Sequence, residues 1–337
     1  MKVLFAHNHR YFPAPILRSR AADFAEHGIE IRSEKATSLA EIRENSDWDY
    51  DVLLLQEPPI DDAFLTAGKP VILMERVDGA QLRRCRDVLW RVAGVIKGYV
   101  FRDRLWYNEI NDRAHVVMLH EADVPCQRPL YGTVPPQPQL AMEELSKIRV
   151  GYGFGALDII GPCVAADVDL DAPRRYDVHF AGTVDYERTE VDTHRFLATQ
   201  AVREWEHKYP GRTVLGQGRT IGEHEYRAGM KQSKVVLCPW GWGEATYRDY
   251  EAMALGAVVI KPDSSHVEAW PDVYQPGVAC ATCRPDFSDV QDVISEVVRN
   301  WESYRPMRER ARKLVVDAWQ PAAIAKHIAG TIKSILA

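Results

Sequence analysis

The chain has 337 residues and a net charge of -6, with 46% hydrophobic and 27% charged residues. This composition is ordinary for a soluble globular protein, so it excludes a disordered chain, a collagen and a disulfide scaffold. The acidic balance argues against nucleic acid as a partner. Because the length exceeds the usual size of a single core, we expect two domains of roughly 150 residues each.

The first residues, MKVLFAHNHRYF, predict a β-strand, because their apolar stretch is short and no cleavage region of small residues follows. No run approaches the roughly 18 apolar residues that cross a bilayer, so we expect a soluble chain that is at most peripheral to a membrane. Six scattered cysteines fit a reducing compartment, and the expected location is the cytoplasm. Cys280 and Cys283 lack the further ligands that a zinc site needs.

Short aliphatic runs alternate with helical patterns along the first half of the chain, which is typical of βαβ units. Their continuous apolar character suits a parallel sheet covered on both faces. We expect this N-terminal Rossmann-like domain to span residues 1–165. Its predicted strands are residues 3–6, 29–31, 52–56, 71–74, 95–100 and 116–119, and its first predicted helix is residues 16–27.

The same pattern restarts after a proline- and aspartate-rich passage at residues 165–177. A second Rossmann-like domain is therefore expected over residues 166–320, with a last helix at 321–337 that returns to the first domain. Pro321 suits the first turn of that helix. The predicted strands are residues 178–181, 213–215, 235–238 and 258–261, and the predicted helices are 194–208, 246–255, two within 289–315, and 321–336.

The most informative segment is residues 238–260, CPWGWGEATYRDYEAMALGAVVI. A buried strand ends at Cys238, a glycine loop follows, and a helix leads to the next strand. Ligands of open α/β sheets lie beyond the carboxyl ends of the strands, where a helix N-terminus attracts phosphate. Arg248 and Glu251 are three residues apart and share a helix face, with Tyr247 nearby. A guanidinium that seeks phosphate thus lies beside a carboxylate able to accept hydrogen bonds from ribose hydroxyls.

An alternative interpretation of Arg248 and Glu251 is a solvated surface ion pair, because an arginine and a glutamate three residues apart on a helix usually form one. The surroundings argue against it. Glu251 begins the small and apolar stretch EAMALGAVVI, where a buried carboxylate needs a partner.

From residue 178 to 268 the sequence resembles the donor domain of GT-B glycosyltransferases, and residues 239–260 are similar to exostosin-like and spore-coat-type bacterial members of the group 1 transferases. The resemblance implies that Arg248 binds the donor phosphate and Glu251 the donor ribose. Many retaining relatives carry two glutamates separated by seven residues. Here Gly243 takes the first place and Glu244 lies one step out of register, so retention or inversion is left open. The matching residues are Gly241, Gly243, Arg248, Glu251, Ala252 and Gly256.

Other loops at predicted strand ends supply further donor-binding candidates. Arg188 would stabilise the charge of a departing diphosphate, with an exposed loop arginine as the alternative. The sequence GQGR around Gly218 and Arg219 could line a nucleoside pocket, but it lacks the third glycine of a dinucleotide fingerprint, so NAD is not supported. The remaining candidates are Gly182, Thr183, Trp240, Tyr247 and the loop residues Ser264, Ser265, His266 and Glu268.

Catalytic candidates come from the first domain. His7 and His9 follow the first predicted strand, in a segment similar to acceptor domains, and would face the interdomain cleft as a general base. A structural histidine is the alternative for each. Glu75 and Asp78 follow another predicted strand and are the acidic alternatives.

We therefore expect an α/β chain of two Rossmann-like domains with parallel sheets facing each other across a cleft. The expected function is transfer of a sugar from a nucleotide-sugar donor to a hydroxyl of a glycan or related acceptor, as in polysaccharide biosynthesis. No cofactor and no metal are expected, since no DxD-like motif lies at a convincing strand end. The alternatives are a nucleotide-sugar 2-epimerase-type isomerase on the same fold and a non-catalytic two-lobe ligand-binding protein.

Overall fold

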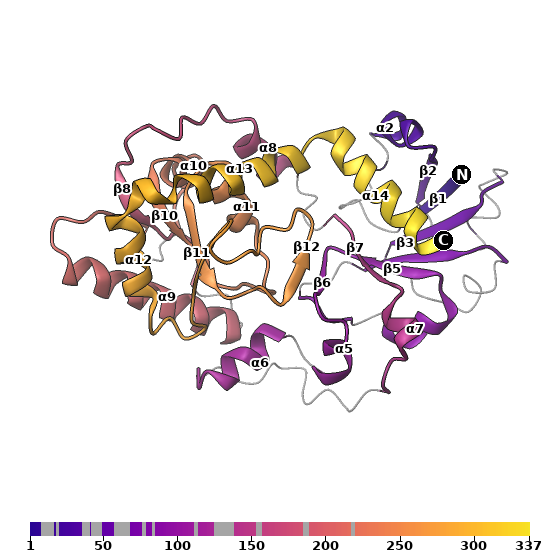
Figure 1. Ribbon diagram of the computed structural model, residues 1–337, viewed down its shortest axis with the longest axis horizontal. Coiled ribbons are helices and arrows are strands. Elements are labelled where there is room, and N and C mark those ends of the chain that lie inside the picture. Colours follow the sequence, from indigo (N-terminus) through magenta and orange to yellow (C-terminus); the bar gives the residue numbers. More distant parts are fainter. Residues whose placement is uncertain are drawn as a thin grey trace.

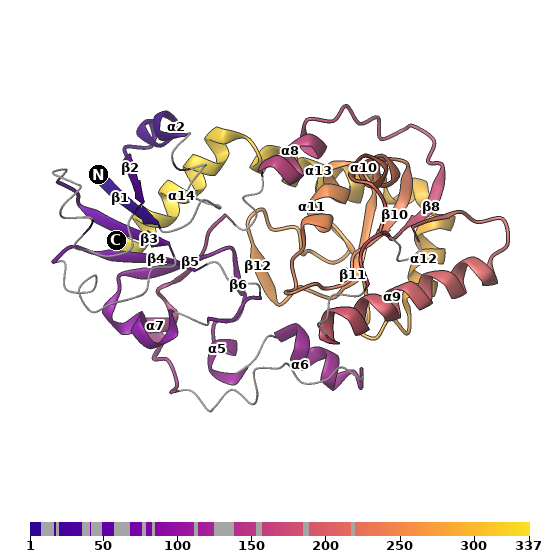
Figure 2. The same ribbon diagram turned by 180° about the vertical axis from the view of Figure 1, so that it is seen from behind.

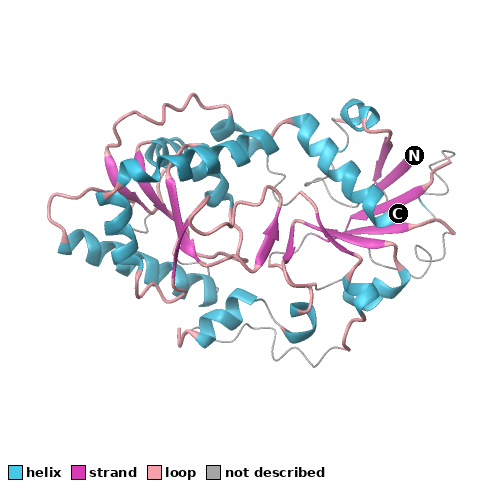
Figure 3. Ribbon diagram, in the orientation of Figure 1, coloured by secondary structure: helices cyan, strands magenta, loops and turns pink. Residues whose placement is uncertain are grey.

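The computed structural model describes residues 1–7, 17, 20–35, 41, 49–56, 68–75, 79–82, 85–110, 114–124, 138–152, 157–184, 189–216 and 220–337. Two parallel β-sheets lie at opposite ends of an elongated molecule, each with helices around it (Figures 1 and 3). The predicted fold class, an α/β chain with two Rossmann-like halves, is confirmed. We call the part around the first sheet the N-half and the part around the second sheet the C-half.

The sheet of the N-half has the order β2-β1-β3-β4-β5-β7, and every neighbouring pair is parallel. The inner strands are buried along their whole length, because the chain covers both faces of the sheet. The strands are β1 (Lys2–His7), β2 (Glu30–Lys35), β3 (Val52–Gln56), β4 (Val71–Glu75), β5 (Gly94–Lys97) and β7 (Ile148–Val150), and the helices are α2 (Ala21–Glu26), η1 (Arg86–Arg91), α5 (Trp106–Glu109), α6 (Ala114–Glu121) and α7 (Met142–Leu145).

Two strand predictions in the N-half are wrong. Residues 116–119 lie within α6, where the buried Val116 and Leu119 are three positions apart and share one face of the helix. A short apolar run does not by itself distinguish a strand from a buried helix. The predicted strand 95–100 is divided, since β5 stays in the sheet while β6 (Tyr99–Phe101) leaves it and pairs elsewhere.

The sheet of the C-half has the order β13-β11-β10-β8-β9 and is also parallel throughout. All four strands predicted here overlap observed ones. Helix α11 connects β10 to β11, so its N-terminus lies at the carboxyl edge of the sheet. The strands are β8 (Tyr176–His179), β9 (Val214–Leu215), β10 (Ser233–Leu237), β11 (Val258–Pro262) and β13 (Ala281–Cys283), and the helices are α8 (Leu157–Val164), α9 (Thr189–Lys208), α10 (Glu223–Lys231), α11 (Tyr247–Ala254), α12 (Val290–Arg299), η2 (Trp301–Tyr304) and α13 (Arg305–Ala318).

The last helix, α14 (Pro321–Leu336), runs from the C-half to the N-half (Figure 2). It packs against α2, and Lys333 Nζ donates a hydrogen bond to the carbonyl oxygen of His27 over 2.6 Å. Ile335 packs against Gly94 at the start of β5. None of the helices that the structure describes is both long and apolar enough to span a membrane.

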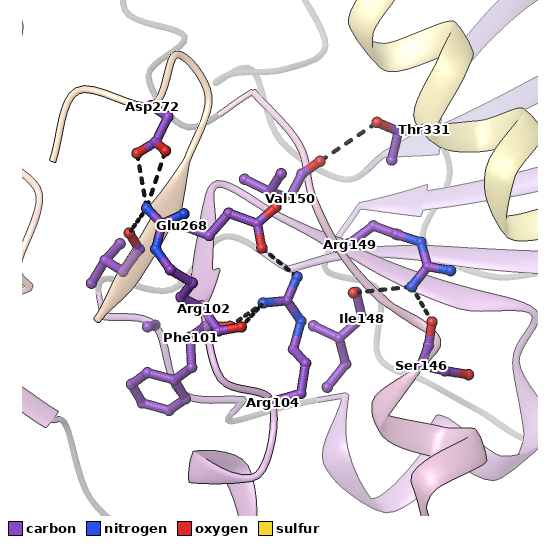
Figure 4. A network of polar contacts seen from close by, with 12 residues as sticks. Phe101, Arg102, Arg104, Ser146, Ile148, Arg149, Val150, Glu268, Asp272 and Thr331 are labelled. Atoms are coloured by element: carbon purple, nitrogen blue, oxygen red, sulfur yellow. Dashed lines mark hydrogen bonds and ion pairs between the residues drawn. The ribbon is translucent and has the colours of Figure 1, made fainter. Parts of the chain in front are cut away.

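A two-stranded ribbon also joins the halves. Strand β6 of the N-half pairs antiparallel with β12 (Val267–Ala269) of the C-half. Two ion pairs accompany the ribbon, from Arg102 Nη2 to Asp272 Oδ1 at 3.0 Å and from Arg104 Nη2 to Glu268 Oε2 at 2.7 Å (Figure 4). Glu268, a candidate for donor binding, is therefore used in the junction between the halves.

Candidate functional site

The carboxyl edges of the two sheets meet at Gly243. A Cβ atom placed on Gly243 would lie 2.1 Å from Tyr99 Oη and 2.4 Å from the backbone nitrogen of Gly79, both in the N-half. The Gly79 amide itself donates to Tyr99 Oη over 2.6 Å. No side chain fits here, so glycine is required by close backbone approach, as expected. The approaching group is the other half of the protein, whereas the sequence argument assigned that space to the donor.

The glycine loop and the start of α11 are held by a buried polar cluster. Lys261 Nζ donates to the Glu244 carbonyl over 2.7 Å and to Asp249 Oδ2 over 2.6 Å, and both side chains of this ion pair are inaccessible to solvent. Tyr274 Oη donates to the same carboxylate over 2.9 Å. Asp249 also caps α11 through the amide and hydroxyl of Thr246. The loop is therefore fixed before any ligand binds.

Arg248 points away from solvent and holds the loop that follows β8. Its Nη2 atom donates to the Ala181 carbonyl over 2.7 Å, and its Nε atom donates to Tyr226 Oη over 3.1 Å. A Cβ atom on Gly182, where φ is +154°, would lie 2.5 Å from Nη2, so this loop also needs glycine. Gly182 and Arg248, two predicted site residues, are thus in direct contact.

The charge of Arg248 is buried, and the acidic residues that act on it, Asp249 and Glu251, lie beyond ion-pair distance. No carboxylate in the described part of the chain lies within 4.0 Å of its nitrogens, and the guanidinium lies 5.3 Å from the centre of the Phe180 ring. Burial by itself lowers the pKa of Arg248, but the neighbouring Tyr226 and Cys238 raise it above its ordinary value. A buried cation of this kind creates a positive potential at the carboxyl edge of the C-half sheet.

A second guanidinium contacts the same loop. Arg195, on α9, donates from Nη1 to the Thr183 carbonyl over 2.7 Å. Its Nη2 atom lies 4.0 Å from the place that a Cβ atom on Gly241 would occupy. The loops after β8 and β10 are neighbours because these strands pair, and Arg195 lies between them. Thr183 Oγ1 lies 3.1 Å from Thr220 Oγ1 on the next loop.

Glu251 is buried beside α10. Its Oε1 atom lies 3.8 Å from Arg227 Nε, and Tyr226 precedes Arg227 on that helix. Burial raises the pKa of Glu251 to about 7, although Arg248 and Arg227 lower it. The alternative interpretation, a solvated surface ion pair with Arg248, does not hold, since both residues are buried and share Tyr226 as a neighbour. Glu251 is therefore a buried carboxylate whose charge changes near neutral pH.

The structure gives Trp240 and His266 roles in packing. Trp240 is buried, packs against Leu119 and Val124 of the N-half, and donates from Nε1 to Ser264 Oγ over 2.9 Å. The prediction that it contacts the donor is not supported by this position. His266 stacks on Trp106 of the N-half with 5.3 Å between the ring centres, and its Nε2 atom lies 3.8 Å from Glu244 Oε1.

Two aromatic side chains remain exposed at this edge. Gly241 N–H donates to the Gly243 carbonyl over 3.0 Å, which makes a tight turn around Trp242. Trp242 is 40% exposed, and so is Tyr247 at the first position of α11. Of the two, only Tyr247 was predicted as a donor-site residue, and that role stays a prediction.

The described catalytic candidates of the N-half are buried. His7 ends β1 and stacks on Phe5 with 5.3 Å between the ring centres. Glu75 accepts a hydrogen bond from the Cys85 amide over 3.3 Å. Its Oε2 atom lies 3.6 Å from Lys97 Nζ, and the side chains of Glu75 and Lys97 are each 1% exposed. A carboxylate already held by a buried cation is poorly placed to take a proton from an acceptor, so this structure does not support Glu75 as the base. His9, Asp78, Arg188, Gly218 and Arg219 lie outside the described residues.

Several residues of the site were not predicted. The capping pattern Thr246-x-x-Asp249 and a lysine at the end of the apolar strand VVIKP were both visible in the sequence, and together they indicate the buried pair of Asp249 and Lys261. Arg195, Tyr226 and Arg227 gave no local signal, because only the crossing of their helices with the strand ends brings them here. Among the described residues, no three His, Cys, Asp or Glu side chains form a group suited to a metal ion.

Comparisons with known proteins agree with the architecture. Residues 162–270 match the family model described as the RXYLT1 C-terminal domain, the part of the chain with the exostosin-like resemblance. A comparison with curated proteins finds no matching sequence.

Among solved structures, a glycosyltransferase from Rickettsia africae ESF-5 has 9% identity and a TM-score of 0.51, with 99% of this chain and 98% of that chain covered. The S. aureus MnaA-UDP structure has 12% identity, a TM-score of 0.49 and coverages of 100% and 97%. Sucrose-phosphate synthase from Thermosynechococcus elongatus has 12% identity, a TM-score of 0.48 and coverages of 100% and 99%. At such identities the likeness concerns the fold, and the chain has the GT-B fold that its sequence predicted.

Proposed function

We propose that this GT-B chain is a glycosyltransferase. It transfers a sugar from a nucleotide-sugar donor, bound at the carboxyl edge of the C-half sheet, to a hydroxyl of a glycan or related acceptor presented by the N-half. A role in polysaccharide biosynthesis in the cytoplasm, with at most peripheral contact with a membrane and none with nucleic acid, belongs to the same proposal.

The buried guanidinium of Arg248 carries the proposal. It lies at the carboxyl ends of parallel strands, the usual ligand position in such sheets, and no described carboxylate is within ion-pair distance. The adjoining loops carry Gly182 and Gly241, and the missing side chain of Gly182 leaves room for the Arg248 guanidinium. An anionic group is the ligand that this potential favours, and the diphosphate of an activated sugar has that chemistry.

The reaction breaks the bond between the anomeric carbon and the diphosphate oxygen and forms a bond from that carbon to the acceptor oxygen. The leaving diphosphate takes the bonding electrons, and positive charge at the C-half edge stabilises it without a metal or another cofactor. Ionised Glu251 accepts hydrogen bonds from the ribose hydroxyls. The acceptor proton passes to a base of the N-half, and His9 and Asp78 stay candidates for that base.

The first test is thermal unfolding of the purified chain with UDP, GDP, CMP or ADP. Ligands that bind only the folded state raise its melting temperature, so we expect at least one of the four nucleotides to do so. Stabilisation by none of them, or by free sugars alone, would contradict a nucleotide-sugar enzyme.

The second test separates the three functions considered for this fold. A transferase releases the free nucleotide when a nucleotide-sugar and an acceptor are present, whereas an epimerase converts the nucleotide-sugar and keeps the phosphate bond. Chromatography of the reaction mixture distinguishes the two outcomes. Nucleotide binding without any turnover across an acceptor panel would favour the non-catalytic ligand-binding protein.

Glu251→Gln tests the ribose contact. Gln has nearly the same shape but offers one acceptor oxygen where the carboxylate offers two, so nucleotide binding should weaken while the fold is kept. Glu225→Gln is the matched control, because Glu225 is an exposed glutamate on α10. A Glu251→Gln variant that unfolds would make Glu251 a core residue and contradict the assignment.

A further inference from the structure

We propose that Arg195 contacts the donor diphosphate and that Arg248 is a positioning residue that shapes the loop on which the diphosphate rests. This division of roles depends on the proposed function and differs from the sequence resemblance, which assigned the phosphate to Arg248. The argument uses the direction of each guanidinium, its hydrogen bonds and its burial.

The hydrogen bonds of Arg248 are directed into the protein. Its Nη2 and Nε atoms donate to the Ala181 carbonyl and to Tyr226 Oη, which belong to the loop after β8 and to α10. The residue is only 8% exposed. Arg248 therefore fixes the backbone that precedes Gly182, and its removal would leave a buried carbonyl and a partly buried phenol without their donor.

Arg195 contacts the same loop and is less buried than Arg248. Its Nη1 atom donates to the Thr183 carbonyl over 2.7 Å, two residues beyond the carbonyl that Arg248 contacts. Its Nη2 atom reaches toward Gly241 on the loop after β10. A guanidinium between two adjacent glycine loops can contact a phosphate that rests on either loop.

Helix α9 holds Arg195 firmly in this place. The preceding residue, His194, lies 2.9 Å from the Pro285 carbonyl through Nε2 and stacks on Phe287 with 4.6 Å between the ring centres. Thr199 Oγ1 donates to the Arg195 carbonyl over 2.8 Å. The side chain therefore extends from a fixed backbone, which reduces the entropy lost when it binds a ligand.

The chemistry of the two arginines predicts different responses to substitution. A phosphate contact needs positive charge at the end of a flexible side chain, so lysine can replace Arg195 in part. The contacts of Arg248 run in two directions from one planar group, and a lysine ammonium cannot reproduce that geometry. Rescue by lysine therefore distinguishes a ligand contact from a positioning role.

The experiment measures binding of UDP, GDP and ADP, of the matching monophosphates and of the nucleosides, by titration calorimetry with wild-type chain and single variants. For the nucleoside diphosphate that binds wild type, Arg195→Gln should lower the affinity by about tenfold or more. The affinity for the matching nucleoside should fall by less than about twofold. Arg195→Lys should recover part of the loss. Arg203→Gln, an exposed arginine on the same helix, is the matched control and should bind as wild type does.

Arg248→Lys should weaken diphosphate, monophosphate and nucleoside together and lower the melting temperature, because the loop loses its shape. If Arg195→Gln keeps the wild-type preference for diphosphate, the inference is wrong while the proposed function stands. A selective loss of diphosphate binding in Arg248→Lys alone would reverse the two roles and also overturn it. If no nucleotide binds wild type, the proposed function and the inference both fail.

Discussion

The carboxyl edges of the two sheets have the same backbone architecture and each holds a buried pair of lysine and carboxylate, but the C-half edge carries a further buried cation. At the N-half edge the buried ammonium of Lys97 forms an ion pair with the buried carboxylate of Glu75. At the C-half edge Arg248 is buried at a distance from carboxylates, and Trp242 and Tyr247 remain exposed. Beside its ion pair of Lys261 and Asp249, the C-half edge therefore has the guanidinium of Arg248, whose charge favours an anionic ligand.

Lys261→Met should have the largest effect on this comparison. It leaves the fully buried Asp249 carboxylate without its cation, and breaking one side of a buried ion pair costs about 3–5 kcal/mol. Urea unfolding should show that loss in the free energy of unfolding. Nucleotide binding should also be lost at temperatures where the variant is folded, because the Glu244 carbonyl and the start of α11 lose their anchor.

Lys97→Met is the matched change at the N-half edge. It removes the cation beside Glu75 and should cost a similar free energy of unfolding. Nucleotide binding should stay within about twofold of wild type, because the ion pair of Lys97 belongs to the N-half and the proposed donor contacts belong to the C-half. Equal loss of nucleotide binding in both lysine variants would show that the two edges do not differ in the proposed way.

Gly243→Ala should have the next largest effect. Its Cβ atom would meet Tyr99 Oη and the backbone of Gly79, and forced packing of this kind costs about 1–3 kcal/mol. The melting temperature should fall, and the carboxyl edges of the two sheets should move apart at this point. The rate of sugar transfer, which needs both edges, should therefore decrease more than the affinity for the nucleotide. Gly330→Ala on α14 is the control, since no heavy atom lies within 4 Å of its Cβ position and alanine favours a helix.

Glu251 gives the C-half edge a dependence on pH. Burial raises its pKa to about 7, so the carboxyl group is protonated below that pH. Since the ionised carboxylate accepts hydrogen bonds from the ribose hydroxyls, nucleotide affinity should fall with decreasing pH, by at most about tenfold per pH unit. Titration calorimetry on both sides of pH 7 should show this slope, and Glu251→Gln should remove it. An unchanged slope in the variant would assign the titration to another group.

The stability of the ligand-free chain should change in the opposite direction. An acid whose pKa is raised by folding stabilises the fold below its unfolded pKa, here 4.5, and that contribution is lost as the pH rises through about 7. Glu251→Gln should therefore gain stability relative to wild type as the pH increases over this range. Urea unfolding of both chains at several pH values measures the difference.

The smallest effect is expected at the junction between the edges. Arg102→Gln removes a half-exposed ion pair with Asp272, and such pairs contribute about 0.2–1 kcal/mol that salt screens. Thermal unfolding at low and high salt should show a difference from wild type only at low salt. A larger loss in the free energy of unfolding would mean that Arg102 stabilises the ribbon by more than its ion pair.

Much of the fold was predictable from local patterns. Helix α14 begins at Pro321 and ends at Leu336 as expected, and β3 has its predicted bounds, because proline at a first turn and a continuous apolar run are strong local signals. The ribbon of β6 and β12 was not predicted. Its pairing joins residues far apart in the chain, and neither strand has more than three residues.

The site was predictable in position but less so in detail. Glycine loops at strand ends placed it at the edge of the second sheet, and that position is where Gly182 and Arg248 meet. The direction of the Arg248 side chain depends on Ala181 and Tyr226, which belong to other elements. Sequence spacing places two residues on one helix face, but it does not tell which neighbours that face meets.

The ribbon between β6 and β12 limits how the protein can be divided. Each strand of the ribbon belongs to a different half, and the backbone pairing joins Tyr99 to Ala269 and Phe101 to Val267. A chimera that exchanges one half for that of a homologue would place unrelated strands in this pairing. Recombination of donor and acceptor specificities in such chains should therefore transfer both strands of the ribbon together, because the boundary that separates the two functions in sequence is crossed by hydrogen bonds in space.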